Sequence, residues 1–162
     1  MPAAGEAVSL WRIAKDTPQY LAVDLSGGGA RFTGGRWNSK RNAVVYTSTT
    51  IALATLETRA HLGGNLSIRN AFLVRIQIPA PVWEQRHCVS AGELAPTWLA
   101  EPPGAASISY GDAWLRARAA PLLLVPSVII PEEYNVLINP AHVAAAMISA
   151  AVLRQYVYDP RL

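Results

Sequence analysis

Cysteine is almost missing from this sequence of 162 residues, which contains only Cys88. A single cysteine cannot form an internal disulfide, which excludes the small disulfide-stapled folds and fits a reducing compartment. Long apolar runs are missing as well. The longest, at residues 121–125 and 143–147, fall far short of the ~20 residues of a membrane-spanning helix. The sequence shows no basic segment followed by an apolar segment, the pattern that marks a secretory signal. We therefore expect a cytoplasmic protein without membrane association.

Blocks of like charge are also missing. The net charge is +3, and the basic residues are spread along the chain rather than gathered in one block. A nucleic-acid-binding protein usually has a clustered basic face or a recognisable module, so we expect no direct nucleic-acid binding. The surplus of arginine suits an anionic small ligand or an acidic protein partner equally well.

Several common site motifs are absent. The glycines at 27–29 have no lysine or Ser/Thr at phosphate-loop spacing and open no G-x-G-x-x-G register, so we predict a turn there. The three histidines lie far apart in sequence, and the pair His87–Cys88 has no second pair to complete a zinc site, so we expect no metal. No G-x-S-x-G elbow indicates a serine nucleophile.

The length and the 51% apolar content fit one domain over residues 1–162 with a substantial core. Residue patterns predict strands at 8–14, 42–48, 71–78, 122–125, 128–130 and 135–139, helices at 50–62, 110–119 and 143–151, and an edge strand within 152–162. The Pro-rich stretch 79–103 predicts only short helical pieces. Strands and helices mix without strict β–α–β alternation, which favours an α+β architecture over a doubly wound sheet.

The most informative stretch, residues 34–61, carries Arg36, Tyr46 and Glu57 across a predicted loop, strand and helix. A guanidinium can bind phosphate oxygens bidentately, and a carboxylate can stabilise a positively charged sugar. This combination indicates chemistry at the ribose of a nucleotide. The alternatives are an arginine stacked on Trp37, an ordinary core tyrosine, and a solvated glutamate paired with Arg59 or His61.

Several segments carry a resemblance to one known family. They are LWRI at 10–13, GGRWN at 34–38, VVY at 44–46, residues 52–57, PSV at 126–128 and NVLINPAH at 135–142. Their order and spacing resemble the RES-domain family, typically toxins of bacterial toxin–antitoxin pairs with an ADP-ribosyltransferase-like fold. The resemblance implies an α+β fold with a central mixed or antiparallel split β-sheet flanked by helices.

The resemblance also implies roles for particular residues. Arg36, Glu57 and Ser127 occupy the positions of the three family residues, and Tyr46 occupies that of an associated tyrosine. Arg36, helped by Arg12, would hold the pyrophosphate of NAD+, and Tyr46 would position the nicotinamide end. Glu57 would stabilise the ribosyl cation, and Ser127 would hydrogen-bond to the ligand or to Glu57.

The expected function is that of a toxin of a type II toxin–antitoxin system that consumes NAD+ as substrate by cleaving the nicotinamide–ribose bond, as an NAD glycohydrolase or phosphorylase. We rank this above modification of a protein by an ADP-ribosyltransferase. A non-catalytic nucleotide- or protein-binding module is the rival, and a nucleic-acid-binding regulator is a weaker third. The resemblance implies an Xre-like antitoxin partner that obstructs the active-site entrance and supplies DNA binding, and we expect it to insert an acidic group near Arg36.

Two further expectations concern the surroundings of the site. The family commonly has glycine where this chain has Arg41, so we expect a differently shaped turn before the tyrosine strand. Asn135, Asn139 and His142 are assigned to the scaffold, as turn and cap residues before a helix.

Overall fold

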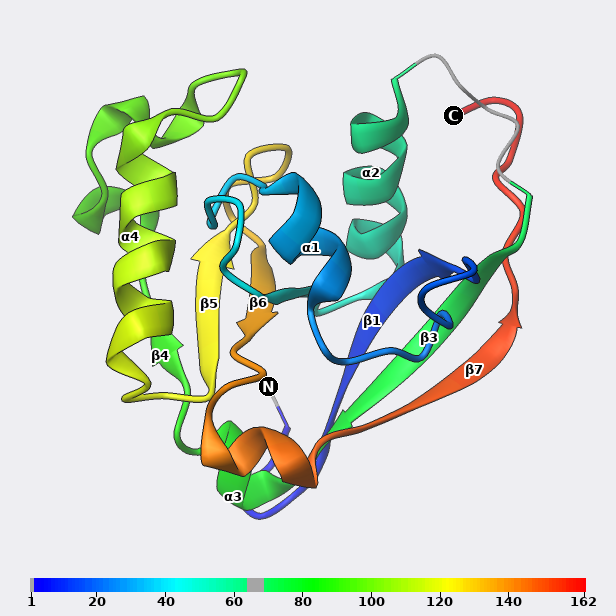
Figure 1. Cartoon of the computed structure of the whole chain (residues 1–162), viewed down its shortest axis with the longest axis horizontal. Coiled ribbons are helices and arrows are strands. Elements are labelled where there is room, and N and C mark those ends of the chain that lie inside the picture. Colours follow the sequence, from blue (N-terminus) through cyan, green and yellow to red (C-terminus); the bar gives the residue numbers. More distant parts are fainter. Residues whose placement is uncertain (1, 64–68) are drawn as a thin grey trace.

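The computed structural model of the chain describes residues 2–63 and 69–162. Within them, the strands are β1 (Val8–Lys15), β2 (Val45–Ser48), β3 (Ala71–Ile78), β4 (His87–Cys88), β5 (Leu122–Pro126), β6 (Tyr134–Ile138) and β7 (Ser149–Gln155). They form one seven-stranded sheet in the order β4-β5-β6-β2-β1-β3-β7 (Figure 1). All paired neighbours are antiparallel except β4 and β5, which are parallel. The predicted α+β class, with a mixed sheet flanked by helices, is confirmed.

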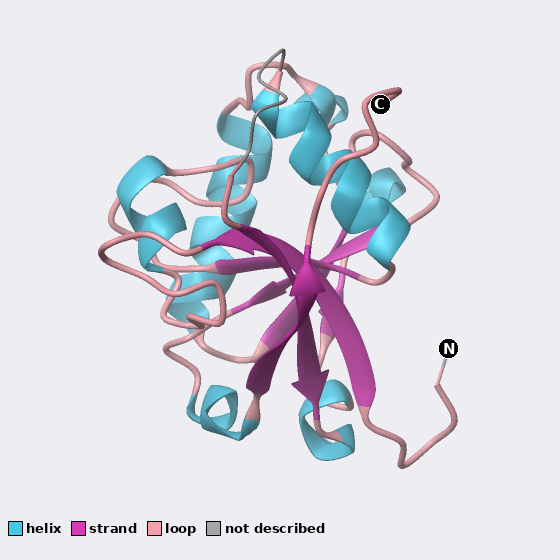
Figure 2. Ribbon diagram, turned by 90° about the vertical axis from the view of Figure 1, so that its right-hand side faces the viewer, coloured by secondary structure: helices cyan, strands magenta, loops and turns pink. Residues whose placement is uncertain are grey.

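The helices of the same residues are α1 (Gly28–Thr33), α2 (Ile51–Leu62), α3 (Ala80–Trp83) and α4 (Ala105–Ala117), with 3-10 helices η1 (Ala91–Glu93), η2 (Pro96–Leu99) and η3 (Val143–Met147). In Figure 1, α3 and η3 lie below the sheet, α2 lies at its upper end, and α4 runs beside β5; Figure 2 shows helices both above and below the strands. None of these helices has the length and apolar character required to cross a bilayer.

The sheet is divided at its centre. β1 pairs with β3 along its whole length but meets β2 at one described register pair, Trp11 with Ser48. The sheet therefore has two halves, β4-β5-β6-β2 and β1-β3-β7, which diverge in Figure 1. Helix α2 packs against both β1 and β2, so the helix that carries Glu57 lies where the two halves part.

Local chemistry explains why α2 begins and ends where it does. The side chain of Thr50 accepts a hydrogen bond from the backbone N of Leu53 at 3.0 Å, the usual arrangement of a helix N-cap. The glycine pair at 63–64 predicts the end of this helix; α2 ends at Leu62 with Gly63 as its C-cap, and Gly64 lies outside the described residues. The threonine cap and the glycine stop thus determine where α2 begins and ends, and so where Glu57 lies along the sheet.

Three other segments differ from the predictions. Residues 27–29 form no simple turn, because Gly27 takes the left-handed conformation (φ 71) that leads into α1. The predicted strand at 128–130 is a turn, since two of its backbone N–H groups bind the side chain of Ser127 instead of a neighbouring strand. The predicted helix at 143–151 is η3 followed by β7, because pairing with β3 outweighs the helical preference of alanine.

Helix α4 begins five residues before the predicted start at 110, and strand β4 was not predicted. The short helical pieces expected in the Pro-rich stretch are present as α3, η1 and η2. The edge strand expected in the C-terminal tail is β7, which begins earlier, at Ser149.

The turn before β2 contains Arg41 in the left-handed conformation, with φ of 80°. A non-glycine residue there costs roughly 1 kcal/mol, and the Arg41 side chain is exposed. We therefore expect Arg41→Gly to raise the free energy of unfolding by about 1 kcal/mol in urea denaturation. Equal or lower stability of the variant would mean that the Arg41 side chain makes a compensating contribution.

Candidate functional site

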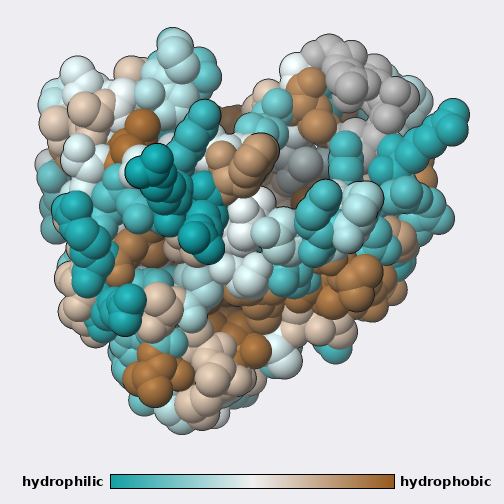
Figure 3. Space-filling view, viewed as in Figure 1, coloured by the Kyte–Doolittle hydropathy of each residue, from teal (hydrophilic) through white to brown (hydrophobic). Residues whose placement is uncertain are grey.

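A small pocket brings together three of the predicted residues. It is lined by Arg36, Trp37, Tyr46, Glu57, Pro126, Val128 and Asn135, with a volume of about 80 Å³. Because this volume is smaller than a dinucleotide, such a ligand would lie only partly inside it. The space-filling view shows a notch at the upper edge of the molecule, between the α4 side and the α2 side (Figure 3).

Glu57 is held by one of its two carboxylate oxygens. Ser127 Oγ donates to Glu57 Oε1 at 2.7 Å, and Asn135 Nδ2 donates to the same oxygen at 2.6 Å. Across the described residues, Oε2 receives no hydrogen bond, and the carboxylate forms no ion pair. Arg59, one of the alternative partners, donates instead to the carbonyls of Gly63 and Leu162. The carboxylate is thus fixed in direction with one oxygen free to bind a ligand.

Ser127 is fully buried directly after β5. Besides donating to Glu57, its Oγ accepts hydrogen bonds from the backbone N atoms of Ile129 and Ile130, each at 3.0 Å. The turn that follows β5 therefore orients the hydroxyl towards the carboxylate. Of the two contacts predicted for Ser127, the one to Glu57 is present, and the one to a ligand stays a prediction.

Asn135, which was assigned to the scaffold from the sequence, lines the same pocket as Glu57. It lies at the start of β6 opposite Ser48 of β2, and Ser48 Oγ donates to Asn135 Oδ1 at 2.7 Å. That bond leaves the amide nitrogen to donate to Glu57. The sequence signal that could have identified Asn135 was an amide at the start of an apolar strand. Its partner on α2 lies far away in the sequence, so this signal did not point to the pocket. Asn139 and His142 do serve as turn and cap residues, as predicted.

Tyr46 joins the pocket wall to the loop that carries Arg36. Its hydroxyl donates to Asn38 Oδ1 at 2.6 Å and accepts from the backbone N of Trp37 at 3.0 Å. Burial raises the pKa of Tyr46 well above its usual value, so the phenol stays neutral. The hydroxyl is therefore committed to the loop, and the ring remains available to a ligand.

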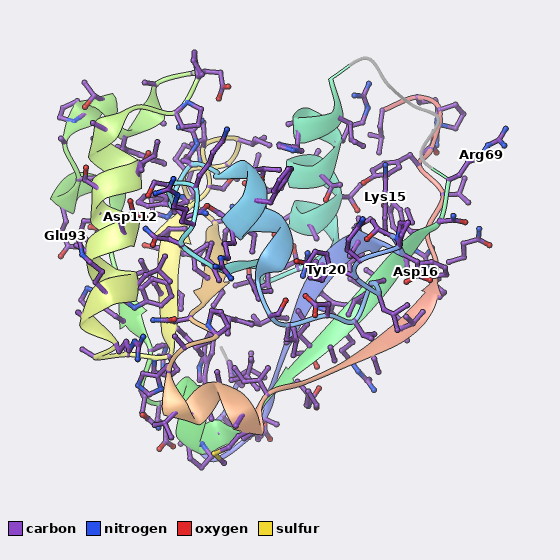
Figure 4. All side chains as sticks on the ribbon, in the orientation of Figure 1. Lys15, Asp16, Tyr20, Arg69, Glu93 and Asp112 are labelled. Carbon is purple, nitrogen blue, oxygen red and sulfur yellow. The ribbon has the colours of Figure 1, made fainter. Side chains whose placement is uncertain are left out.

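A carboxylate on α4 fixes the far side of the same loop. Asp112 accepts hydrogen bonds from Ser39 N at 3.0 Å, Ser39 Oγ at 2.6 Å and Asn42 Nδ2 at 2.8 Å (Figure 4). Burial alone would raise the pKa of Asp112, but these hydrogen bonds outweigh it and lower the pKa. The loop that presents Arg36 is thus anchored to both β2 and α4.

Arg36, which lines the same pocket as Glu57, is held by partners from a segment remote in sequence. Its Nη1 donates to the carbonyls of Trp98 (2.9 Å) and Ala100 (2.8 Å), and its Nη2 forms an ion pair with Glu101 Oε2 at 2.6 Å. All three partners belong to η2 and the segment after it. Arg36 therefore supports one wall of the pocket as well as lining it.

Arg12 is not among the residues that line this pocket. It lies on β1, where its Nη1 donates to the carbonyl of Asp24 at 3.2 Å. Burial lowers the pKa of Arg12, an effect that the nearby Asp24 partly offsets. The role predicted for Arg12 beside Arg36 stays a prediction.

A larger pocket, of about 280 Å³, lies on the opposite face of the sheet. It is lined by Thr49, Thr50, Trp83, Leu124, Glu132, Glu133 and Tyr134. Leu124 of this pocket packs in the same core cluster as Val45 of β2. Tyr46, the residue after Val45, packs in the cluster on the other face of the sheet. None of the predicted site residues lines this pocket. In the described part of the chain, no three His, Cys, Asp or Glu residues form a group able to hold a metal.

Comparison with known proteins identifies the family. The model of the RES domain matches residues 9–159. The chain belongs to the RES domain family. Its predicted membership of the RES-domain toxins is confirmed.

Curated relatives of this RES domain are named as toxins. The chain is 49% identical over 154 residues to the "Prs ADP-ribosylating toxin" of Sphingobium sp. (strain YBL2), covering 95% of this chain and 96% of the relative. It is 33% identical over 146 residues to "Toxin Res" of Yersinia enterocolitica, covering 89% and 93% respectively. The RES domain thus matches these relatives over almost their whole lengths.

A solved structure shares the fold of this RES domain. The crystal structure of the M. tuberculosis MbcT–MbcA toxin–antitoxin complex contains a chain that matches with a TM-score of 0.59 and 15% sequence identity. The match covers 93% of this chain and 86% of that chain. At this identity, the likeness establishes the shared fold.

Proposed function

We propose that this RES domain is the toxin of a toxin–antitoxin pair and that it cleaves the nicotinamide–ribose bond of NAD+. The observation that carries the proposal is the Glu57 carboxylate, fixed through Oε1 by two donors and with Oε2 unbonded among the described residues. Arg36 and Tyr46 line the same pocket. A carboxylate held in this way suits a substrate on which positive charge develops during the reaction.

The chemistry follows from the charge of the transition state. As nicotinamide departs with the bonding electron pair, positive charge spreads over the ribose ring oxygen and C1′. The Glu57 carboxylate attracts this charge more strongly than it attracts the ground-state sugar. In a site shielded from water, such a fixed charge contributes several kcal/mol. Ser127 and Asn135 position the carboxylate beforehand, so little reorganisation accompanies the reaction.

The other pocket residues suit the remaining parts of NAD+. The rings of Trp37 and Tyr46 offer aromatic surface to the nicotinamide, and Arg36 offers a guanidinium to the pyrophosphate. The pocket encloses only about 80 Å³, which fits one ring of the substrate rather than all of it. The adenosine end would accordingly lie outside the enclosed part.

The positioning role of Asn135 can be tested by Asn135→Asp. The change places a second carboxylate at the position from which Asn135 Nδ2 now donates to Glu57 Oε1 at 2.6 Å. While the pair holds one proton, it keeps one negative charge and a hydrogen bond between positions 135 and 57; once both carboxylates are ionised, they repel and Glu57 loses its orientation. We expect turnover of the variant to fall on the order of tenfold as the pH rises through the loss of the shared proton, a fall that the wild type does not show.

The measurement is the pH profile of nicotinamide release by wild type and variant. Asn70→Asp is the matched control, because Asn70 is exposed and is not among the residues that line the pocket. A profile of Asn135→Asp that keeps its shape and its position on the pH axis would contradict the positioning role.

The acceptor of the ADP-ribosyl group decides the reaction class. Water gives an NAD glycohydrolase, inorganic phosphate gives a phosphorylase, and a protein side chain gives an ADP-ribosyltransferase. The name of the Sphingobium relative, at 49% identity, favours a protein acceptor as the second candidate. Incubating the purified chain with labelled NAD+, with and without phosphate and with a cell extract, separates the three by their products. Labelled protein supports transfer, and free ADP-ribose supports hydrolysis. Absence of nicotinamide release under all conditions would favour the non-catalytic binding module.

A toxin of this kind requires an inhibitory partner. The chain shares its fold with a member of a solved toxin–antitoxin complex, and a relative is named "Toxin Res". We propose an antitoxin of the Xre-like type that covers the pocket entrance and supplies the DNA binding of the complex. Co-purification with the product of the adjacent gene tests this, and loss of co-purification on substitution of residues around Arg36 would locate the interface.

A further inference from the structure

The guanidinium of Arg36 has two distinct halves. Nη1 is bound to the main-chain carbonyls of Trp98 and Ala100, at 2.9 and 2.8 Å. These two bonds tie the arginine to the end of η2 and do not depend on any side chain of that segment. Nη2 instead binds a side chain, the carboxylate of Glu101, at 2.6 Å. One half of the guanidinium is therefore structural, and the other half holds an anion.

The anion at Nη2 is held in an exchangeable way. The Arg36 side chain is 15% exposed, whereas the Glu101 side chain is 76% exposed, so the Glu101 carboxylate can turn into water and leave its place beside Arg36 to another anion. Ion pairs with one partner this exposed are weak. A phosphate group carries more charge than a carboxylate and offers an arginine several oxygens in bidentate geometry. A phosphate is thus able to replace the Glu101 carboxylate.

We infer that Glu101 competes with the phosphate groups of the substrate for Arg36, and so helps to determine which nucleotides the pocket accepts. The inference rests on the proposed function. A substrate with a pyrophosphate displaces the Glu101 carboxylate, and the two carbonyl bonds keep Arg36 in place while this happens. A nucleoside without phosphate leaves the ion pair intact and gains nothing from Arg36. Glu101 accordingly lowers the affinity of the site for phosphate-bearing ligands and leaves its affinity for uncharged fragments unchanged.

The substitution Glu101→Gln tests this directly. It keeps the size of the side chain and removes the charge, so the phosphate no longer has to displace an anion. We expect the KM for NAD+ to fall by about two- to fivefold with kcat unchanged, the range that corresponds to an exposed ion pair. Glu84→Gln is the matched control, since Glu84 is an exposed glutamate after α3, and its removal changes the net charge by the same amount.

A binding measurement separates this inference from the proposed reaction. Inorganic pyrophosphate, titrated calorimetrically into wild type, Glu101→Gln and Glu84→Gln, reports on the anion position without any turnover. A Kd about two- to fivefold tighter in Glu101→Gln, unchanged in Glu84→Gln, supports competition even if NAD+ is not cleaved. Weaker or equal binding by Glu101→Gln, or no pyrophosphate binding by any variant, overturns the inference. A failure of the proposed function alone would appear as altered pyrophosphate binding without nicotinamide release.

Discussion

Glu57→Gln is expected to reduce the kcat for nicotinamide release on the order of 100-fold or more while changing KM little. Glutamine keeps the size of the side chain and can still accept from Ser127 and Asn135 through its carbonyl oxygen. It loses the negative charge that faces the sugar. Because that charge acts mainly in the transition state, its removal affects turnover rather than binding.

The control for this variant is Glu132→Gln. Glu132 lines the larger pocket on the opposite face of the sheet, so its neutralisation removes one charge at a site that takes no part in the proposed reaction. Rates are measured by chromatography of released nicotinamide. A full rate in Glu57→Gln would remove the electrostatic mechanism, and a loss confined to Glu132→Gln would move the active site to the other pocket.

Gly111→Ala is expected to destabilise the protein by about 3 kcal/mol. Gly111 lies in α4 where the helix crosses the loop that carries Arg36, and a Cβ on it would lie 1.8 Å from the carbonyl oxygen of Trp37. The obstructing atoms are backbone rather than a flexible side chain, so either the helix or the loop must shift. Since Asp112 binds Ser39 of the same loop, the shift also strains that anchor.

Urea denaturation measures this effect. Gly92→Ala provides the control, because a Cβ at Gly92 meets no atom within 4 Å. We expect the control to unfold near the wild-type midpoint and Gly111→Ala to unfold far below it. Equal midpoints for the two variants would show that α4 and the loop separate easily, contrary to the contact described.

The sequence was most informative where local signals agreed. Helix α2 could be predicted because a threonine cap, an apolar face and a glycine stop occur within one segment, and β3 was predicted with its observed bounds. The segment 34–61 contains Arg36, Tyr46 and Glu57. Their common pocket could therefore be predicted from residues that lie close together in the chain.

Features that depend on distant contacts could not be predicted in this way. The alanines at the start of β7 favour a helix locally, and only their pairing with β3 makes them a strand. Asn135 reaches Glu57 because β6 pairs with β2 in one particular register, which no local pattern encodes. The ion pair of Arg36 with Glu101 joins residues separated by 65 positions, and only the folded chain reveals it.

The most direct measurement is a crystal structure of Glu57→Gln bound to NAD+, in which slow turnover preserves the ligand. The account predicts the side chain at position 57 within hydrogen-bond distance of the ribose next to nicotinamide, with Arg36 on the pyrophosphate. NAD+ bound in the larger pocket by Glu132, or oriented with its adenine against position 57, would contradict it.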